Sequence, residues 1–255
     1  MMKKIAIVSM PRTASKMVIG NFASYTVAKF GNVSKLLLDD GIVRNCTDEF
    51  LNPGFQELFA GKAKLLDTGD VRITAEAFDS LDQELIDRVW IFNQISKPAV
   101  LKYFPFSKYM SITDSVLDRV DNIYYLGRKD LFSHVLSCCI SYQTNSWIAN
   151  KIQENIIRDK IQNKISIPPE LFRTVLKEFQ HYSNICIGKS VFEFDNIIQM
   201  RDAKDFCNMF KLEFVEFKFS NSDLEFTDNK ELMINNIDEL RKIMEDDTER
   251  PQSLP

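Results

Sequence analysis

The stretch KKIAIVSMPRTASKMVIGNF, residues 3–22, joins a short apolar run to a basic loop rich in hydroxyl groups. Residues 5–8 are small or branched apolar residues between charge and Pro11, a pattern typical of a buried strand in a parallel sheet. From Val18 onward, apolar residues recur at helical spacing until Gly31, where we expect the helix to end. The sequence therefore predicts a strand, a turn at residues 10–16 and a helix.

Four side chains of the predicted turn suit an anion: Arg12, Thr13, Ser15 and Lys16. A helix N-terminus offers unpaired backbone N–H groups and the positive end of the helix dipole. The two cations add charge, and the two hydroxyl groups add hydrogen-bond donors. We interpret the turn as a phosphate or sulfate site. The alternative is an ordinary helix N-terminus with solvated charges.

Two common nucleotide-binding motifs do not match this turn. The Walker A motif needs glycines around the phosphates and a hydroxyl residue after its lysine, whereas this turn has no glycine and Met17 follows Lys16. The G-x-G-x-x-G dinucleotide turn is also missing. An ordinary ATP or GTP site is therefore disfavoured.

The composition is that of a soluble globular protein, with 255 residues that are 45% hydrophobic and 27% charged. A net charge of −4 argues against a broad nucleic-acid surface but allows a local basic pocket. No apolar run approaches the ~20 residues of a membrane span, and none resembles a signal peptide, so we expect a cytoplasmic protein. The five cysteines lack C-x-x-C spacing, and there are only two histidines, so we expect free thiols and no metal site.

Strand and helix patterns alternate along the chain, which predicts an α/β fold with a mostly parallel central sheet flanked by helices. We expect one domain at residues 1–245 and a disordered tail at 246–255. Residues 40–75 are expected to be loops. Strands are expected at residues 5–8, 33–38 and 97–104, within 122–130 before a charged loop, and within 190–197 before a turn, with an edge strand at 212–219. Helices are expected near residues 79–96, 111–120, 131–156, 167–185, 201–210 and 229–244.

Ligands of parallel sheets bind where the strands end. The turn after residues 5–8 and the loop that begins with Arg128 both follow predicted strands. If these strands share one sheet and one direction, two anionic groups can be held at the same edge. A nucleotide that carries phosphate groups at both ends would require two such anion sites.

Five stretches, in this order along the chain, resemble the sulfotransferase superfamily and are closest to its trehalose sulfotransferase-like branch. PRTASK is similar to the loop that binds the 5′-phosphosulfate of the donor, 3′-phosphoadenosine 5′-phosphosulfate. YYLGRKDLFSHVLSCCISYQTNSW is similar to the segment that binds its 3′-phosphate. TDEFLNPG, KPAVLKYF and VFEFDNI resemble three further segments of the family.

The resemblance implies a P-loop-like three-layer α/β sandwich that moves a sulfuryl group to a hydroxyl of a carbohydrate or small metabolite, without a metal. Adenosine 3′,5′-bisphosphate would be the product. The implied donor-binding residues are Arg12, Thr13, Ala14, Ser15, Lys16, Arg128 and Ser137. Glu49 matches the general base, Arg12 and Lys16 would stabilise the leaving phosphate, and Glu49 and Lys102 would contact the acceptor.

The turn departs from the family pattern at two positions. Ala14 stands where relatives have glycine, and Lys16 stands where they have a hydroxyl residue. If position 14 requires a positive φ, alanine there costs about 1 kcal/mol or more. Two alternative functions therefore stay open: a small kinase of the P-loop type, and a nucleotide-binding protein without catalytic activity. We also leave a homodimer open.

Single residues have simpler interpretations beside these roles. The simpler interpretation of Arg128 is an ion pair with Asp130 or Asp121, and that of Ser137 is an ordinary buried helix position. Glu49 lies in a polar loop, where a carboxylate is normally solvated. His134 is an alternative base, although a lone histidine at helical spacing is more often packed in a core.

Overall fold

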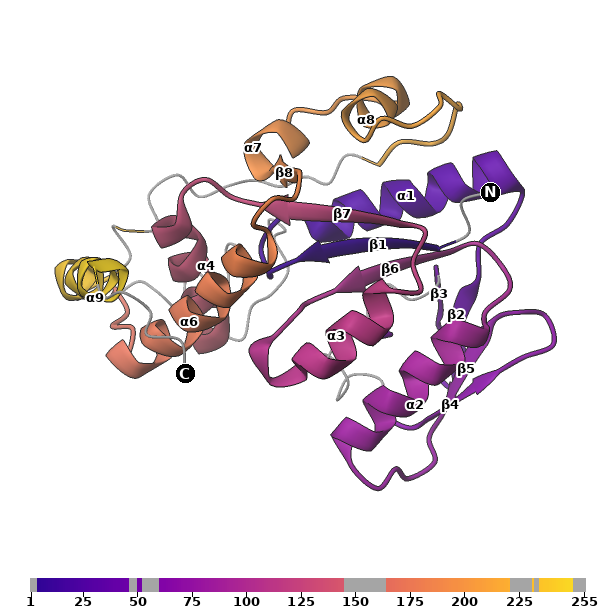
Figure 1. The fold of residues 1–255 in the computed structure, drawn as a ribbon, viewed down its shortest axis with the longest axis horizontal. Helices are drawn as coiled ribbons and strands as arrows, with labels where there is room; N and C mark the ends of the chain where they lie inside the picture. The colour runs from indigo at the N-terminus through magenta and orange to yellow at the C-terminus, as the bar shows by residue number, and fades with distance from the viewer. Residues whose placement is uncertain are drawn as a thin grey trace. The chain divides into compact units, whose positions relative to one another are not determined.

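The computed structural model describes residues 4–45, 50–51, 60–144, 164–220, 231 and 234–249. The chain forms two compact units (Figure 1). Unit 1 consists of Met1–Gly127 and Gly188–Ser222, and unit 2 consists of Arg128–Ile187 and Asp223–Pro255. Within the described ranges, no helix combines the length and the apolar character needed to cross a membrane.

Unit 1 is built on a four-stranded sheet in which every neighbouring pair is parallel, with the order β6-β1-β7-β8. Every residue of β1 after Lys4 is buried, which explains its uninterrupted apolar run. The predicted parallel sheet is therefore confirmed. Its strands are β1 (Lys4–Ser9), β6 (Ala99–Tyr103), β7 (Asn122–Gly127) and β8 (Val191–Glu193).

Helices cover both faces of this sheet (Figure 1). On one face, Phe22 of α1 (Ser15–Phe30) packs against Tyr124 of β7, with ring centroids 4.8 Å apart. On the other face, Thr113 of α3 (Met110–Leu117) lies 2.9 Å from the hydroxyl of Tyr103 in β6. The predicted three-layer α/β sandwich is confirmed. Unit 1 also contains α2 (Leu81–Gln94), the short 3-10 helix η2 (Ser107–Tyr109), α7 (Phe194–Ile197) and α8 (Ala203–Met209).

A second, mixed sheet follows α1, with the order β3-β2-β5-β4. β2 (Lys35–Leu38) was predicted, whereas β3 (Val43–Asn45), β4 (Lys62–Leu65) and β5 (Val71–Thr74) occupy the region expected to be loops. These strands have three or four residues each and carry charged residues in their interiors. Their pattern is therefore too short and too polar to predict a strand.

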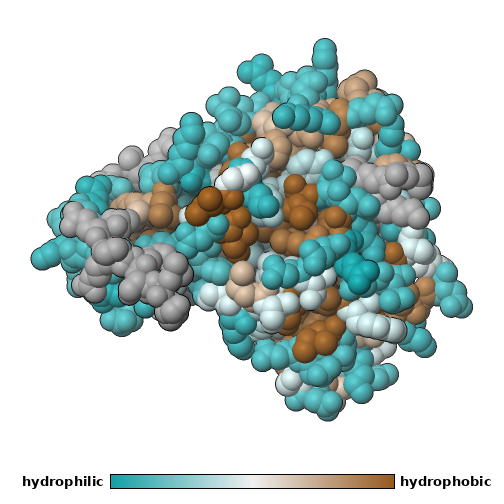
Figure 2. Space-filling view, viewed as in Figure 1, coloured by the Kyte–Doolittle hydropathy of each residue, from teal (hydrophilic) through white to brown (hydrophobic). Residues whose placement is uncertain are grey.

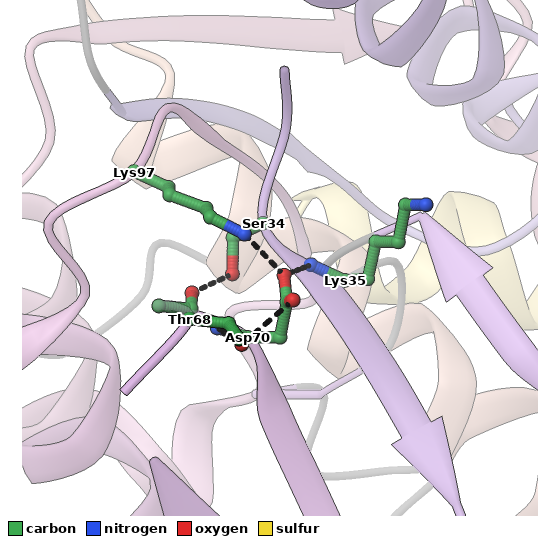
Figure 3. Close-up of polar contacts among 6 residues, drawn as sticks. Ser34, Lys35, Thr68, Asp70 and Lys97 are labelled. Carbon is green, nitrogen blue, oxygen red and sulfur yellow. Dashed lines mark hydrogen bonds and ion pairs between the residues drawn. The ribbon is translucent and has the colours of Figure 1, made fainter. Parts of the chain in front are cut away.

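Asp70 ties this second sheet to the lead-in of β6 (Figure 3). Its carboxylate accepts hydrogen bonds from Lys97 Nζ at 3.0 Å, Lys35 N at 2.9 Å and Thr68 Oγ1 at 2.9 Å. Burial opposes the charged form of Asp70, but these donors outweigh it and lower the pKa of the carboxyl. Ser34 adds a hydrogen bond to the carbonyl of Gly69 at 2.8 Å.

Unit 2 contains α4 (Leu131–Thr144), α6 (Pro169–Ile185) and α9 (Ile237–Glu249). Edge-on contacts between aromatic rings join α4 to α6, with His134 and Phe179 at 4.3 Å. Asn236 exchanges two hydrogen bonds with the backbone of Ile167, at 3.0 and 2.9 Å. Helix α9 extends through residues 246–249, within the segment expected to be a tail.

The surface is mostly hydrophilic on the visible face, with separate apolar patches between (Figure 2). Trp90 and Ile86 of α2 are among the large apolar side chains that remain exposed.

The segment at residues 212–219, predicted to be an edge strand, is not part of either sheet. The prediction of an edge strand was wrong. The segment has the alternating side-chain pattern of a strand, but its backbone pairs with no neighbouring strand among the described residues.

A buried ion pair lies on the inner side of α2. Arg88 is fully buried and donates through Nη2 to Glu84 Oε1 and through Nη1 to the carbonyl of Phe50 at 3.3 Å. Burial lowers the pKa of Arg88 and raises that of Glu84, although the attraction between the two charges opposes both shifts. Each partner loses solvation on burial, and the contact between the two charges offsets part of that cost.

We expect Glu84→Ala to lower the free energy of unfolding by about 3–5 kcal/mol, because it removes the buried carboxylate to which the buried Arg88 guanidinium donates. Urea unfolding followed by circular dichroism measures this loss. The double change Glu84→Leu with Arg88→Met should recover most of it. Glu170→Ala breaks the exposed pair with Arg173 and is the control, with an expected change of about 0–1 kcal/mol. Equal losses in Glu84→Ala and Glu170→Ala would contradict this account.

Candidate functional site

The turn between β1 and α1 has an unusual backbone. Arg12 and Ala14 both adopt left-handed conformations, with φ of 69° and 58°. Helix α1 begins at Ser15, directly after Ala14, and no side chain caps its N-terminus. The predicted strand, turn and helix are thus confirmed, and position 14 does require the positive φ that glycine would adopt without strain.

The backbone N–H groups of four consecutive residues in this turn point to an anion site. Met17 N and Val18 N donate to the carbonyl of Ala14, at 3.0 and 3.2 Å. In contrast, the N–H groups of residues 13–16 have no acceptor among the residues that the structure describes. Successive amides in a tight turn form a concave donor surface that binds anions.

The side chains of the turn differ in burial and in contacts. Thr13 is fully buried, and its hydroxyl donates to the carbonyl of Met10 at 3.0 Å, so this side chain holds the turn together. Ser15 is buried and Arg12 is half-buried, whereas Lys16 is exposed. Within the described part of the chain, Lys16 forms no ion pair, and the first turn of α1 has no acidic residue.

Lys16 lies at the positive end of the α1 helix dipole. A cation in the first turn of a helix is electrostatically unfavourable, because the N-terminus already carries partial positive charge. Unsatisfied amides and a lysine therefore concentrate positive potential at one point. A bound anion would relieve this potential, and locally unfavourable choices of this kind are typical of functional sites.

Two further residues of unit 1 lie on the same face of the main sheet. Lys102 in β6 pairs in register with Ile7 of β1, and Ser9 lies two residues beyond Ile7, so their side chains share the face that α1 covers. Lys102 is 4% exposed, with its Nζ 4.9 Å from the centre of the Phe104 ring. It is the next-to-last residue of β6, near the end of the strand predicted at residues 97–104, and it is buried there.

Ser9 was missed by sequence analysis. It is fully buried at the carboxyl end of β1, and its Oγ has no hydrogen-bond partner among the described residues. An orphan hydroxyl in a core needs an explanation, such as a ligand that completes it. The only signal in the sequence is a hydroxyl residue at the end of an apolar run.

The other predicted donor-binding residues belong to unit 2. Arg128 is its first residue and is half-buried, and Ser137 is buried in α4. Asp130 accepts hydrogen bonds from the backbone and hydroxyl of Ser133, at 3.0 and 2.6 Å. Burial opposes its charge, but these bonds and the charge of Arg128 lower the pKa of Asp130. The charge of Arg128 is the smallest of these effects, and the simpler interpretation of Arg128 as an ion-pair partner of an aspartate stays a prediction.

Several candidate residues have structural roles or lie outside the description. Glu49, the candidate base, lies outside the described residues. His134, the alternative base, is buried against Phe179, which favours a packing role. Among the described residues, no group of three or more His, Cys, Asp or Glu side chains is arranged to hold a metal ion. Unit 1 thus brings together residues 12–16, Ser9 and Lys102, and unit 2 holds Arg128 and Ser137.

No family model, no curated protein and no solved structure matches this chain. The likeness to sulfotransferases therefore depends on the quoted motifs alone. The geometry of the β1–α1 turn is independent of that likeness, and it provides the physical basis for assigning a function.

We expect Ala14→Gly to raise the free energy of unfolding by about 0.5–1 kcal/mol, because glycine removes the strain of a left-handed alanine. Gly31→Ala is the matched control: Gly31 has φ of 81° and an added Cβ would meet no atom within 4 Å, so only backbone strain changes. That variant should lose stability. Denaturant unfolding of both proteins checks the two signs. A destabilised Ala14→Gly protein would mean that residue 14 is not left-handed in solution.

Proposed function

We propose that this chain is a sulfotransferase that moves a sulfuryl group from 3′-phosphoadenosine 5′-phosphosulfate to a hydroxyl of a carbohydrate or small metabolite. The β1–α1 turn carries the proposal, because four consecutive backbone N–H groups without an acceptor stand beside an exposed Lys16. The five motif resemblances and the α/β architecture support the same assignment.

The donor set of the turn fits a phosphosulfate group. Such a group is a compact, multiply charged anion that accepts several hydrogen bonds at once. The amides of residues 13–16 and the Lys16 ammonium can supply these donors, and no first-turn carboxylate repels the ligand. The orphan Ser9 hydroxyl is one further donor at the end of the same strand.

Sulfuryl transfer needs an acceptor aligned with the leaving group, a base for its proton and positive charge near the leaving phosphate oxygen. Arg12, Lys16 and the turn amides would stabilise that developing charge. The resemblance assigns the base to Glu49 and an acceptor contact to Lys102. Burial fixes the position of Lys102, so its charge would act from a constant place in unit 1.

The two alternative functions are less well supported. A kinase of the P-loop type needs glycines around the phosphates, and this turn has none. A protein without catalytic activity was suggested by Ala14 and Lys16, where relatives have glycine and a hydroxyl residue. However, Ala14 adopts the left-handed conformation despite its Cβ, so the loss of glycine does not abolish the turn.

We expect adenosine 3′,5′-bisphosphate to bind with EDTA present, because the site supplies its own positive charge. Isothermal titration calorimetry measures this binding, with ATP and Mg²⁺ as the comparison. Lys16→Ala should weaken binding by about 0.5–1.5 kcal/mol. Lys64→Ala, which removes an exposed lysine of β4, is the control. Binding that appears only with Mg²⁺ would favour the kinase and overturn the proposal.

Arg128 has a separate test, because its role comes from the resemblance alone. Arg128→Ala should weaken adenosine 3′,5′-bisphosphate by about 1.5–3 kcal/mol, the scale of a charge-assisted hydrogen bond. Adenosine 5′-phosphosulfate lacks the 3′-phosphate and should bind almost unchanged. Arg173→Ala provides a control in unit 2. Equal losses for both ligands would show that Arg128 acts elsewhere or only stabilises the fold.

A further inference from the structure

Residues 213–219, which follow α8 in unit 1, have the side-chain alternation of a β-strand. Phe217 is buried, with its ring 6.1 Å from Tyr25 and 5.6 Å from Phe206. Phe214, Glu216 and Lys218 alternate with the inward positions and are exposed. A period of two residues requires an extended backbone, so one face of this segment packs on unit 1 and the other meets solvent.

The backbone of this segment has no partner. Among the described residues, no group hydrogen-bonds to the main-chain N–H or C=O groups of residues 213–219. The two ends are held, because Leu212 N donates to the carbonyl of Cys207 at 2.8 Å, and Ser220 exchanges two hydrogen bonds with the buried side chain of Asn21. An extended, anchored segment with a free hydrogen-bonding edge is a template for an added strand.

The exposed charges of the segment select one occupant and one register. In an antiparallel pair, residues directly opposite each other share a face. If two copies pair with Phe217 opposite Phe217, then Glu216 of each copy faces Lys218 of the other. A pair centred on Glu216 would instead place two carboxylates together, and one centred on Lys218 would place two ammonium groups together.

We propose that two copies of this chain associate through residues 213–219, paired as antiparallel strands centred on Phe217. The outer face then carries two ion pairs between Glu216 and Lys218, and the inner face places Val215 opposite Phe219 twice. Neither charge has an ion pair within the described chain, so both are available. Charges on an edge strand commonly prevent pairing, but here they have opposite signs at positions that meet.

Sedimentation velocity over a range of protein concentrations tests this pairing. The wild-type chain should form a dimer. Lys218→Glu and Glu216→Lys each place like charges opposite one another and should weaken the dimer by about tenfold or more in Kd. The double variant Glu216→Lys with Lys218→Glu should restore it. Lys204→Glu makes the same charge change at an exposed position of α8 and should have no effect.

Mixing the two single variants gives a stricter test. Glu216→Lys carries lysine at both positions, and Lys218→Glu carries glutamate at both. An equimolar mixture of the two should therefore form a heterodimer, although neither variant dimerises well by itself. All four substituted proteins should keep the wild-type unfolding midpoint, because the changed side chains are exposed. A wild-type chain that stays monomeric, single variants that dimerise normally, or a double variant that does not recover would each overturn the pairing.

Discussion

The burial of β1 on both faces is the constraint on which the rest of unit 1 depends. A strand flanked by parallel neighbours on each side must end at the same edge as they do, and α1 must return across the sheet to cover the face that contains Ile7 and Tyr124. The connecting turn therefore lies at the carboxyl edge of the sheet. There the backbone N–H groups of residues 13–16 form no hydrogen bonds with neighbouring strands among the described residues. The position of the proposed anion site follows from this topology.

The stability of the turn comes from elsewhere in unit 1. Left-handed conformations at Arg12 and Ala14 cost about 1–2 kcal/mol each, and Lys16 opposes the helix dipole. Helix α1 compensates, because Phe22 is fully buried among the rings of Tyr124, Phe206 and Phe210. A well-packed helix can thus hold a strained N-terminus ready for a ligand, so that binding requires little reorganisation.

Patterns set by neighbours in sequence were predictable, and those set by distant contacts were not. The buried run of β1 and the stop at Gly31 follow from local chemistry, and both are present. Lys102 could not be recognised as buried, because its burial depends on strands and helices far along the chain. Glu84 and Arg88 have the spacing of a surface pair, yet both are buried, and Arg88 lies over the Phe50 ring. Residues 213–219 have the alternation of a strand, but a pattern cannot reveal whether a neighbouring strand exists.

The insertion of Arg128–Ile187 between β7 and β8 also sets the order of folding during synthesis. β8 pairs with β7 through Tyr125, Leu126 and Gly127, but the ribosome must first make the whole intervening part of unit 2. At ordinary elongation rates, that delay is about 3–12 s. For that time the outer edge of β7 has no strand beside it. A nascent chain is then exposed to mispairing at β7. Chaperone binding would protect this edge, whereas a pause in translation at this point would prolong its exposure.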